Sequence, residues 1–371
     1  MRENTNRSTS RRVRAAVSAA VAVCAVTVVL PGAAWAGTTD AADGALPRVA
    51  GVERLSVTTD GIQADDNSAD AAISPEGDRV VFSSHARNLR PGDTGTGDRV
   101  YVRDRRSAQT TRLGIHSPLE PAVISPDGGY VAYPARVMRA DQIHQFQLSS
   151  GRSIGTHCSA RACRVAQGAD GRHLVYGVLF NPPEPNQRVE VYDRDANTRQ
   201  TIDIIHNIAS IAPSISADGR FVAYQDGVEQ DVFLWDRTDN TPAGPIEGPA
   251  KAATLVQLSA EGGKVVYLSG SDTYVHDTGS GTAQLVPNVK GVAIDPTGRY
   301  LLYAPNGTGG PSLVLRDLRT GTDETVSDQP ASARAGAVSA NGRDVVFQSA
   351  AADIVPGDSN GKTDVFVRTF H

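Results

Sequence analysis

The phrase SADGRFVAY, residues 216–224, decides the fold because it recurs in related form along the chain. In six of the seven copies an acidic or amide residue precedes the Gly, and the two make a tight turn that needs a positive φ. The alternating Val-x-Tyr or Val-x-Phe that follows, with Leu in place of Val in two copies, buries one face of a strand, so each copy predicts a hairpin between two strands. The seven copies are SPEGDRVVF from Ser74, SPDGGYVAY from Ser125, GADGRHLVY from Gly168, SADGRFVAY from Ser216, SAEGGKVVY from Ser259, DPTGRYLLY from Asp295 and SANGRDVVF from Ser339.

The spacing of these copies is that of a propeller blade. Successive glycines of the phrase lie 51, 43, 48, 43, 36 and 44 residues apart, and a four-stranded blade takes about 40–50 residues. A ring of such blades leaves only short, protected sheet edges. The sequence therefore predicts an all-β, seven-bladed β-propeller of four-stranded antiparallel blades, a single domain over residues 52–371.

A second signal follows the phrase by about 15 to 25 residues, where a strand ends in aspartate, as in VFLWDRTDN at Asp236. An aspartate carboxylate accepts backbone N–H bonds from residues two or three positions later, which holds a turn without any chemistry. Blade two departs from the pattern, with Leu148-Ser149-Ser150-Gly151 in this place. We interpret the recurring aspartates as structural turn residues: Asp104, Asp193, Asp236, Asp277 and Asp317.

The last blade is one strand short. The chain ends on DVFVRTFH, which reads as a third strand, and no sequence follows it for a fourth. Residues 52–58, VERLSVT, have the alternation of an outer strand and precede the first phrase. We predict that this N-terminal strand completes the seventh blade, closing the ring and covering an edge that would otherwise pair with other chains.

The phrase, followed by Y-V-x-D, resembles the TolB-like, or PD40, branch of the WD40-like β-propellers. The segments NLRPGDTGTGDRVYVRD and DIVPGDSNGKTDVFVR in the first and last blades resemble an exported bacterial subgroup. The resemblance covers residues 52–371 and implies the fold, but propellers carry unrelated functions, so it implies no activity. TolB carries an α/β domain before its propeller, and only residues 37–51 precede the first strand here, so its role in an envelope complex is not transferred.

The N-terminus has the pattern of a secretory signal. Basic residues at 11, 12 and 14 precede an apolar run over 15–30, and the A-x-A sequence of residues 34–36 follows. We predict a signal peptide over 1–36 with cleavage after Ala36, a short linker over 37–51, and a secreted or cell-envelope protein. The pattern leaves the Sec and twin-arginine routes open. The run is shorter than the roughly 20 residues that span a membrane, so no membrane span is expected.

The remaining chain is acidic. Without residues 1–36 it holds 31 basic and 40 acidic residues, a net charge of −9. Nucleic acid and anionic membrane surfaces are poor partners for such a charge. We expect a monomer whose partner is a protein, a peptide or a glycan.

Two cysteines, Cys158 and Cys163, remain after the signal peptide is removed. An even pair in an exported protein predicts one disulfide, and two free thiols in a loop are the alternative.

The loop DSNGKTD, residues 358–364, has the oxygen spacing of a cation loop. Asp358, Asn360 and Asp364 would supply three ligands for calcium, and backbone carbonyls and water the others. Asn360-Gly361 equally fits a plain turn. The companion loop keeps Asp93 and Asp98 but has Gly95 in place of the amide, so the two loops are not equivalent. Calcium is the one cofactor that the sequence suggests, and none is required.

No catalytic motif stands out. The G-x-S-x-G elbow, H-E-x-x-H, C-x-x-C and the phosphate loop are all absent from the sequence, and no catalytic residue is predicted. Histidines from different blades would meet at the axis of the ring, and some sugar lyases of this fold use such a set to bind a metal; His85, His144 or His276 would supply it here. We interpret the histidines of this chain as scattered surface residues. The prediction is a secreted, non-catalytic propeller that binds its ligand through loops at one mouth of the ring. The alternatives are a propeller-fold lyase or hydrolase and a scaffold of an envelope complex.

Overall fold

The computed structural model describes residues 50–92, 97–158, 163–179, 187–202, 213–227 and 230–371. They belong to one compact unit, Leu46–His371. The predicted signal peptide, its cleavage site and nearly all of the linker lie outside the described residues and stay predictions, as does the part of the companion loop that holds Asp93 and Gly95. Among the described residues, no helix is long and apolar enough to cross a membrane.

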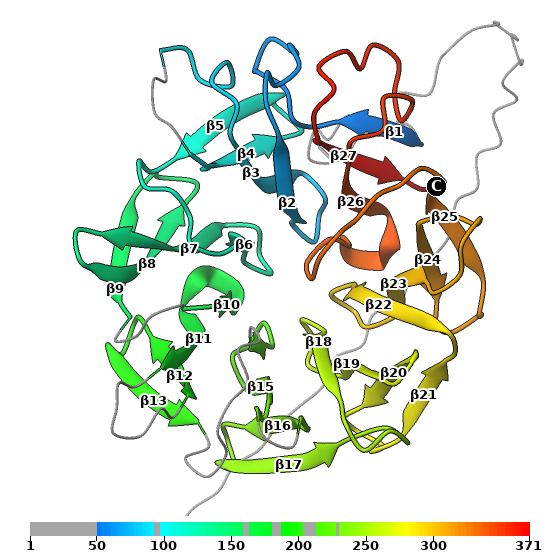
Figure 1. Cartoon of the computed structure of the whole chain (residues 1–371). Helices are drawn as coiled ribbons and strands as arrows, with labels where there is room; N and C mark the ends of the chain where they lie inside the picture. The colour runs from blue at the N-terminus through cyan, green and yellow to red at the C-terminus, as the bar shows by residue number, and fades with distance from the viewer. Residues whose placement is uncertain (1–49, 93–96, 159–162, 180–186, 203–212, 228–229) are drawn as a thin grey trace, which may run out of the picture. The chain divides into compact units, whose positions relative to one another are not determined.

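Six four-stranded antiparallel sheets follow one another along the chain (Figure 1). In each sheet the first strand in sequence faces the axis and the fourth lies outermost. Blade 1 consists of β2 (Ser68–Ile73), β3 (Arg79–Ser84), β4 (Arg99–Asp104) and β5 (Gln109–Leu113). Blade 2 consists of β6 (Val123–Ile124), β7 (Tyr130–Val137), β8 (Ala140–Gln147) and β9 (Ser153–His157). Blade 3 consists of β10 (Val165–Gln167), β11 (His173–Leu179), β12 (Gln187–Asp193) and β13 (Thr198–Ile202).

The next three blades have the same order of strands. Blade 4 consists of β14 (Ser214–Ile215), β15 (Phe221–Gln225), β16 (Val232–Asp236) and β17 (Thr241–Ile246). Blade 5 consists of β18 (Thr254–Leu258), β19 (Lys264–Ser269), β20 (Asp272–Asp277) and β21 (Ala283–Val286). Blade 6 consists of β22 (Val289–Ile294), β23 (Tyr300–Pro305), β24 (Leu313–Asp317) and β25 (Asp323–Ser327). Two short 3-10 turns, Ala169–Gly171 and Ala340–Gly342, take the place of the plain turn in two copies of the phrase.

The repeated phrase forms the hairpin turn between the first and second strands. In blade 4 the Ser216 hydroxyl accepts the N–H of Phe221 at 2.9 Å, and the Gly219 N–H donates to the Ser216 carbonyl at 2.9 Å. Gly219 has a φ of +74°, and a Cβ there would lie within 3 Å of the His173 ring of blade 3. The serine and the glycine therefore have separate roles, since one closes the turn and the other lets neighbouring blades approach.

The core lies between neighbouring blades. The aromatic residue that ends every copy of the phrase is buried and often stacks on an aromatic of the third strand, as Tyr224 does on Phe233 with ring centroids 5.7 Å apart. Burying one such side chain contributes about 1.5–3 kcal/mol. The phrase thus supplies both the turn and the main core residue of its blade. The fully buried members of this set are Phe82, Tyr133, Tyr176, Tyr224, Tyr267 and Phe347.

The seventh blade joins the two ends of the domain. It contains β26 (Asp344–Ser349), β27 (Asp364–Thr369) and β1 (Gly51–Arg54), with β27 in the middle (Figure 1). β1 is antiparallel to β27, and Gly51 is paired with Thr369. The prediction of a seven-bladed ring closed by an N-terminal strand is confirmed. The innermost position of this blade holds two isolated bridges, from Ser332 and Val338 to β26, in place of a continuous strand.

The closing strand is shorter than the predicted 52–58. Pairing stops after Arg54 because the N–H groups of Leu55 and Ser56 both donate to the Val365 carbonyl, at 2.8 and 3.4 Å. The chain then turns back, and Val57 forms a bridge with Gln63. Residues 55–64 therefore form a loop against the end of blade 7 and are not a continuation of β1.

Glutamine side chains tie neighbouring blades together near the axis. Most accept a backbone N–H from the first strand of the next blade. An inner strand gains a hydrogen bond in this way without a fifth strand. The contacts are Gln348 Oε1 with Asp70 N (2.7 Å), Gln225 Oε1 with Leu255 N (3.0 Å), Gln257 Oε1 with Ile294 N (3.1 Å) and Gly336 N (3.2 Å), and Gln167 Nε2 with the Val123 carbonyl (3.0 Å).

Candidate functional site

The predicted disulfide is present. Cys158 and Cys163 are bonded to each other, with their Cα atoms 6.5 Å apart. Both are buried against blades 2 and 3, where Ile143 and Val165 belong to the same apolar cluster. The disulfide therefore fixes the connection between β9 and β10.

The five recurring aspartates end the third strands β4, β12, β16, β20 and β24. In blade 3 the Asp193 carboxylate accepts the N–H groups of Asp195 and Ala196, both at 3.0 Å. In blade 5 Asp277 accepts those of Gly279 and Ser280, at 3.1 and 2.7 Å. The other three accept one or two turn N–H groups in the same way. Each carboxylate thus holds the turn to the outermost strand.

The sequence reasoning missed a basic partner for these aspartates. It lies one or two positions after the glycine of the phrase, next to the aspartate across the hairpin. The bonds from this partner lower the pKa of Asp193, Asp277 and Asp317 below the usual range of a carboxyl. The signal was visible as the R or K of D-G-R and G-G-K. The pairs are Arg79–Asp104 (3.6 Å), Arg172–Asp193 (2.8 Å), Arg220–Asp236 (2.6 Å), Lys264–Asp277 (2.5 Å) and Arg299–Asp317 (2.5 Å).

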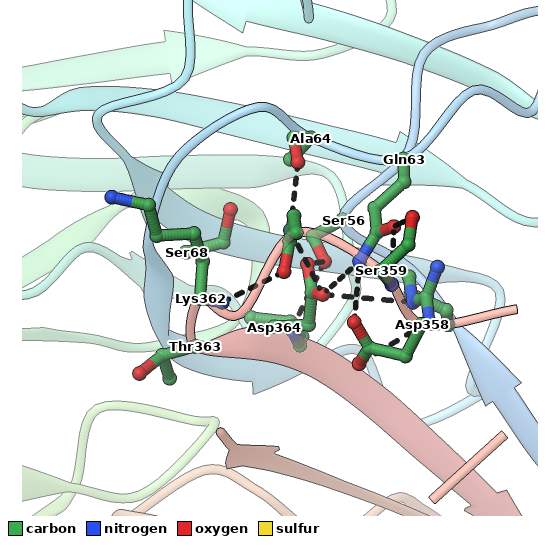
Figure 2. Close-up of polar contacts among 12 residues, drawn as sticks. Ser56, Gln63, Ala64, Ser68, Asp358, Ser359, Lys362, Thr363 and Asp364 are labelled. Atoms are coloured by element: carbon green, nitrogen blue, oxygen red, sulfur yellow. Dashed lines mark hydrogen bonds and ion pairs between the residues drawn. The ribbon is translucent and has the colours of Figure 1, made fainter. Parts of the chain in front are cut away.

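The DSNGKTD loop is bound to the N-terminal segment of the domain. Figure 2 shows the Gln63 side chain between the two carboxylates of the loop, with its amide group 2.8 Å from Asp358 and 2.7 Å from Asp364. The Arg54 guanidinium lies 3.3 Å from Asp358 and 3.6 Å from Asp364. The Ser56 hydroxyl donates to Asp364 at 2.5 Å. We call this cluster of Arg54, Ser56, Gln63, Asp358 and Asp364 the clasp.

The candidate cation ligands do not form an open oxygen shell. Asn360 Oδ1 accepts the N–H of Lys362 at 2.8 Å, and its amide group donates to the Ala64 carbonyl at 2.8 Å. Asp358 and Asp364 face a guanidinium, whose charge disfavours a second cation at the same carboxylates. Asp364 is fully buried, and this burial raises its pKa although the bonds from Ser56 and Gln63 oppose the shift. Calcium takes six to eight oxygen ligands, and protein donors already occupy several oxygens of this loop, so the cation site stays a prediction.

The three candidate histidines lie on separate blades and have other neighbours. His85 Nδ1 is 2.9 Å from an Asp98 oxygen. His144, on β8, stacks with Tyr133, and burial lowers its pKa. His276 is on β20 of blade 5. Among the described residues no three His, Cys, Asp or Glu side chains gather as metal ligands would.

A central cavity is lined by the innermost strands of all the blades. Its described lining comes from β2, β6, β10, β14, β18 and β22, and from residues 334–338 of blade 7, and its volume is about 180 Å³. Aliphatic side chains dominate this lining, with no His, Asp, Glu or aromatic residue in its described part. The polar side chains that line it are those of Ser125, Gln167, Ser214, Gln257 and Arg334.

Arg334 is the charged residue of this lining. Its Nε donates to the Asp70 carbonyl at 3.1 Å, and its Nη2 donates to the Ala122 carbonyl. The contacts connect blade 7 to blades 1 and 2. Burial lowers the pKa of Arg334 to about 10, with the negative charge of Asp70 acting in the opposite direction. The guanidinium remains protonated at neutral pH, and it forms no ion pair with any residue that the structure describes.

No model of a protein family matches the chain, and no curated protein is similar to it. Solved structures are similar in fold. An oligogalacturonate lyase in complex with manganese is 13% identical with a TM-score of 0.61, over 86% of this chain and 93% of that one. The oligogalacturonate lyase of Vibrio parahaemolyticus is 13% identical with a TM-score of 0.60, over the same shares. TolB from Acinetobacter baumannii is 14% identical with a TM-score of 0.48, over 70% of this chain. The similarity covers only 62% of that TolB chain. At these identities the comparisons establish the propeller fold alone.

Proposed function

We propose that this protein is an exported binding module whose central cavity and the loops around it receive part of a protein, peptide or glycan ligand. The observation that carries the proposal is the lining of the cavity, which is aliphatic with a few amide and hydroxyl groups and a single guanidinium. Such a lining provides apolar contact and directed hydrogen bonds. Acid–base catalysis by a carboxyl or imidazole group would need side chains of another kind.

The framework around the cavity supports the same role. Strands from six blades and a segment of blade 7 reach the cavity, and the glutamine contacts fix neighbouring inner strands relative to one another. A rigid wall reduces the entropy that is lost when a ligand binds. A volume of about 180 Å³ has room for on the order of ten water molecules, so a side chain or a chain end fits but a folded domain does not.

Site-specific cross-linking tests the proposal. A photo-reactive amino acid is placed at Ala335, which lines the cavity, or at Ala196, an exposed residue of the turn between β12 and β13. Each protein is exported into the native medium, irradiated, and its adducts are identified by mass spectrometry, with an immobilised glycan panel as a second probe. We expect one recurrent adduct from position 335 that is absent from position 196. No adduct at either position and no glycan signal, or identical adducts at both, would contradict a cavity-centred binding role.

The competing class is a propeller-fold polysaccharide lyase or hydrolase with residues from several blades. The similarity to oligogalacturonate lyases names a substrate to test, although the identity of 13% supports only the fold. To test for lyase activity, the protein is incubated with oligogalacturonate, with and without manganese. The ultraviolet absorbance of an unsaturated product is then measured. A scaffold in an envelope complex, the third reading, predicts adducts at exposed positions such as 196 and none in the cavity.

We also propose that the chain is an exported member of the TolB-like, PD40 branch and a monomer in solution. The repeated phrase and the N-terminal signal pattern support the first part, and the covered edge of blade 7 supports the second. N-terminal sequencing of the exported protein should begin at Gly37, and light scattering should give the mass of a single chain.

A further inference from the structure

We infer that the central cavity binds a carboxylate carried on an aliphatic group, with Arg334 as the residue that recognises the charge. The inference rests on the proposed binding function and names the chemistry of the ligand. Arg334 lies where the innermost strand of blade 7 is interrupted. Bridges to β26 flank the break at Ser332 and Val338, and between them the Ala337 N–H donates to the Arg334 carbonyl at 3.1 Å. The chain leaves the sheet here and brings Arg334 to the wall of the cavity.

The guanidinium has donors to spare. Of its five N–H groups, two donate to described residues, one to the Asp70 carbonyl and one to the Ala122 carbonyl. Both partners are neutral, so they orient the group without neutralising it. Arginines that pair elsewhere in the domain behave differently: Arg54 faces Asp358 and Asp364, and Arg105 lies 2.9 Å from Asp344.

No described residue neutralises the positive charge of Arg334 through an ion pair. Asp70 on β2 acts on Arg334 electrostatically, but it forms no ion pair with Arg334 and does not line the described part of the cavity. A charged group in a partly dehydrated cavity carries a desolvation cost that an anion with hydrogen-bonding oxygens offsets. The cavity therefore favours a ligand with one negative charge.

The lining determines which monoanion fits. A carboxylate matches the planar fork of a guanidinium through two parallel hydrogen bonds. A phosphate dianion would need a second cation, and the described lining holds only Arg334. The walls are aliphatic, from residues such as Ile124, Ile215 and Val256, and their described part has no aromatic ring on which a sugar would stack. The group behind the carboxylate is thus aliphatic, either the chain end of a peptide or a short fatty acid.

The test compares each acid with its amide on the unaltered exported protein. The probes are hexanoate against hexanamide, and the tripeptide Ala-Ala-Val with a free carboxyl against the same peptide with a terminal amide, titrated by calorimetry. We expect at least one acid to bind about tenfold or more tightly than its amide, because a hydrogen bond to a charged group is lost. Binding by the tripeptide alone identifies a chain end, and binding by hexanoate alone identifies a free acid. Equal affinity of acid and amide, or no binding by either acid at millimolar concentration, overturns the inference.

Two variants assign the effect to the residue. Arg334→Gln should lose about tenfold or more in affinity for the acid and none for the amide. Arg316→Gln removes an arginine that pairs with Asp323 at 2.6 Å outside the cavity, and it should bind as the parent does. If the Arg334→Gln variant does not fold, the acid and amide titrations of the parent protein still test whether the cavity recognises a carboxylate. A recurrent adduct at position 335 that neither acid displaces would leave the binding function standing and this inference wrong.

Discussion

Asp193 and Asp364 both lie beside a guanidinium, yet their pKa values move in opposite directions. Asp193 holds an accessible turn of blade 3, and the bonds from Arg172 lower its pKa. Asp364 lies fully buried in the clasp, and burial raises its pKa despite the bonds from Ser56 and Gln63. The bonds from Arg172 and from the turn outweigh the effect of burial on the first carboxylate, whereas burial outweighs the bonds that the second carboxylate accepts.

The two regions also differ in how far apart their partners lie in sequence. Arg172 and Asp193 are 21 residues apart, so the turn closes within one blade. Gln63 and Asp364 are 301 residues apart, and their contact requires the whole ring to be in place. Each repeated turn is therefore a local structure that can change without the others, whereas the clasp can form only when the complete ring has closed.

Removal of the closing segment should have the largest effect. Deletion of residues 51–60 removes β1, the buried Leu55 and the Arg54 and Ser56 members of the clasp, and exposes the edge of β27. We expect aggregation or a fall of many degrees in melting temperature, measured by calorimetry and size-exclusion chromatography. A peptide of residues 49–60 added in trans should restore part of the loss. A monomeric deletion variant with the melting temperature of the parent would disprove closure by β1.

Loss of the buried carboxylate should come next. Asp364→Ala leaves Arg54 with one fewer charged partner and leaves the bonds from Ser56 and Gln63 unmade, which costs about 3–5 kcal/mol of unfolding free energy. Asp193→Ala, the matched control in a blade turn, should cost about 1 kcal/mol. Urea denaturation measures both values. Equal costs at the two positions would show that burial and long-range pairing add nothing to the clasp.

The pH dependence should separate the two regions by sign. Asp193, Asp236, Asp277 and Asp317 have a lowered pKa in the fold, so they contribute stability above about pH 4 that is lost as the pH falls through their folded values. Asp364 has a raised pKa, so its ionisation reduces stability as the pH rises from the unfolded value through the folded one. Melting temperatures from pH 2.5 to 7 for the parent, Asp193→Asn and Asp364→Asn measure this. Asp193→Asn should reduce the fall in melting temperature at low pH, and Asp364→Asn should increase it.

Calcium should have the smallest effect. The clasp carboxylates already face Arg54 and Gln63, so addition of calcium or of EDTA should leave the melting temperature unchanged. The same titration on Asp358→Asn is the control. A rise with calcium in the parent that disappears in Asp358→Asn would restore the cation site.

The sequence predicted those features that each blade specifies by itself. Gly219 and the equivalent glycines of the other copies have a positive φ. The spacing of the copies predicted four-stranded blades, and their number predicted seven of them. The missing strand of the last blade pointed to residues 52–58, because a ring must pair every edge. The end of β1 at Arg54 depends on two N–H groups sharing the Val365 carbonyl, which no pattern of residues indicates.

The candidate site was less predictable for a physical reason. The spacing of Asp358, Asn360 and Asp364 is that of a cation loop, but Gln63, which donates to two of them, is about 300 residues away in the sequence. Arg334 lies in no motif, and its importance follows from where the broken strand places it relative to six other blades. Contacts between segments that are far apart in sequence leave no local signal in the chain.

The pairing of Gly51 with Thr369 also has a topological consequence. With both ends of the described domain side by side, a short linker from His371 to Gly51 would turn β27 and β1 into an ordinary hairpin. New ends opened in the turn at Ser280 would then leave β21 as the strand supplied from the other terminus. A circularly permuted chain of this kind should fold to the same ring with blade 5 as the joint. Blade 7 is therefore the closing blade because the chain enters the ring at β1 and completes it at β27.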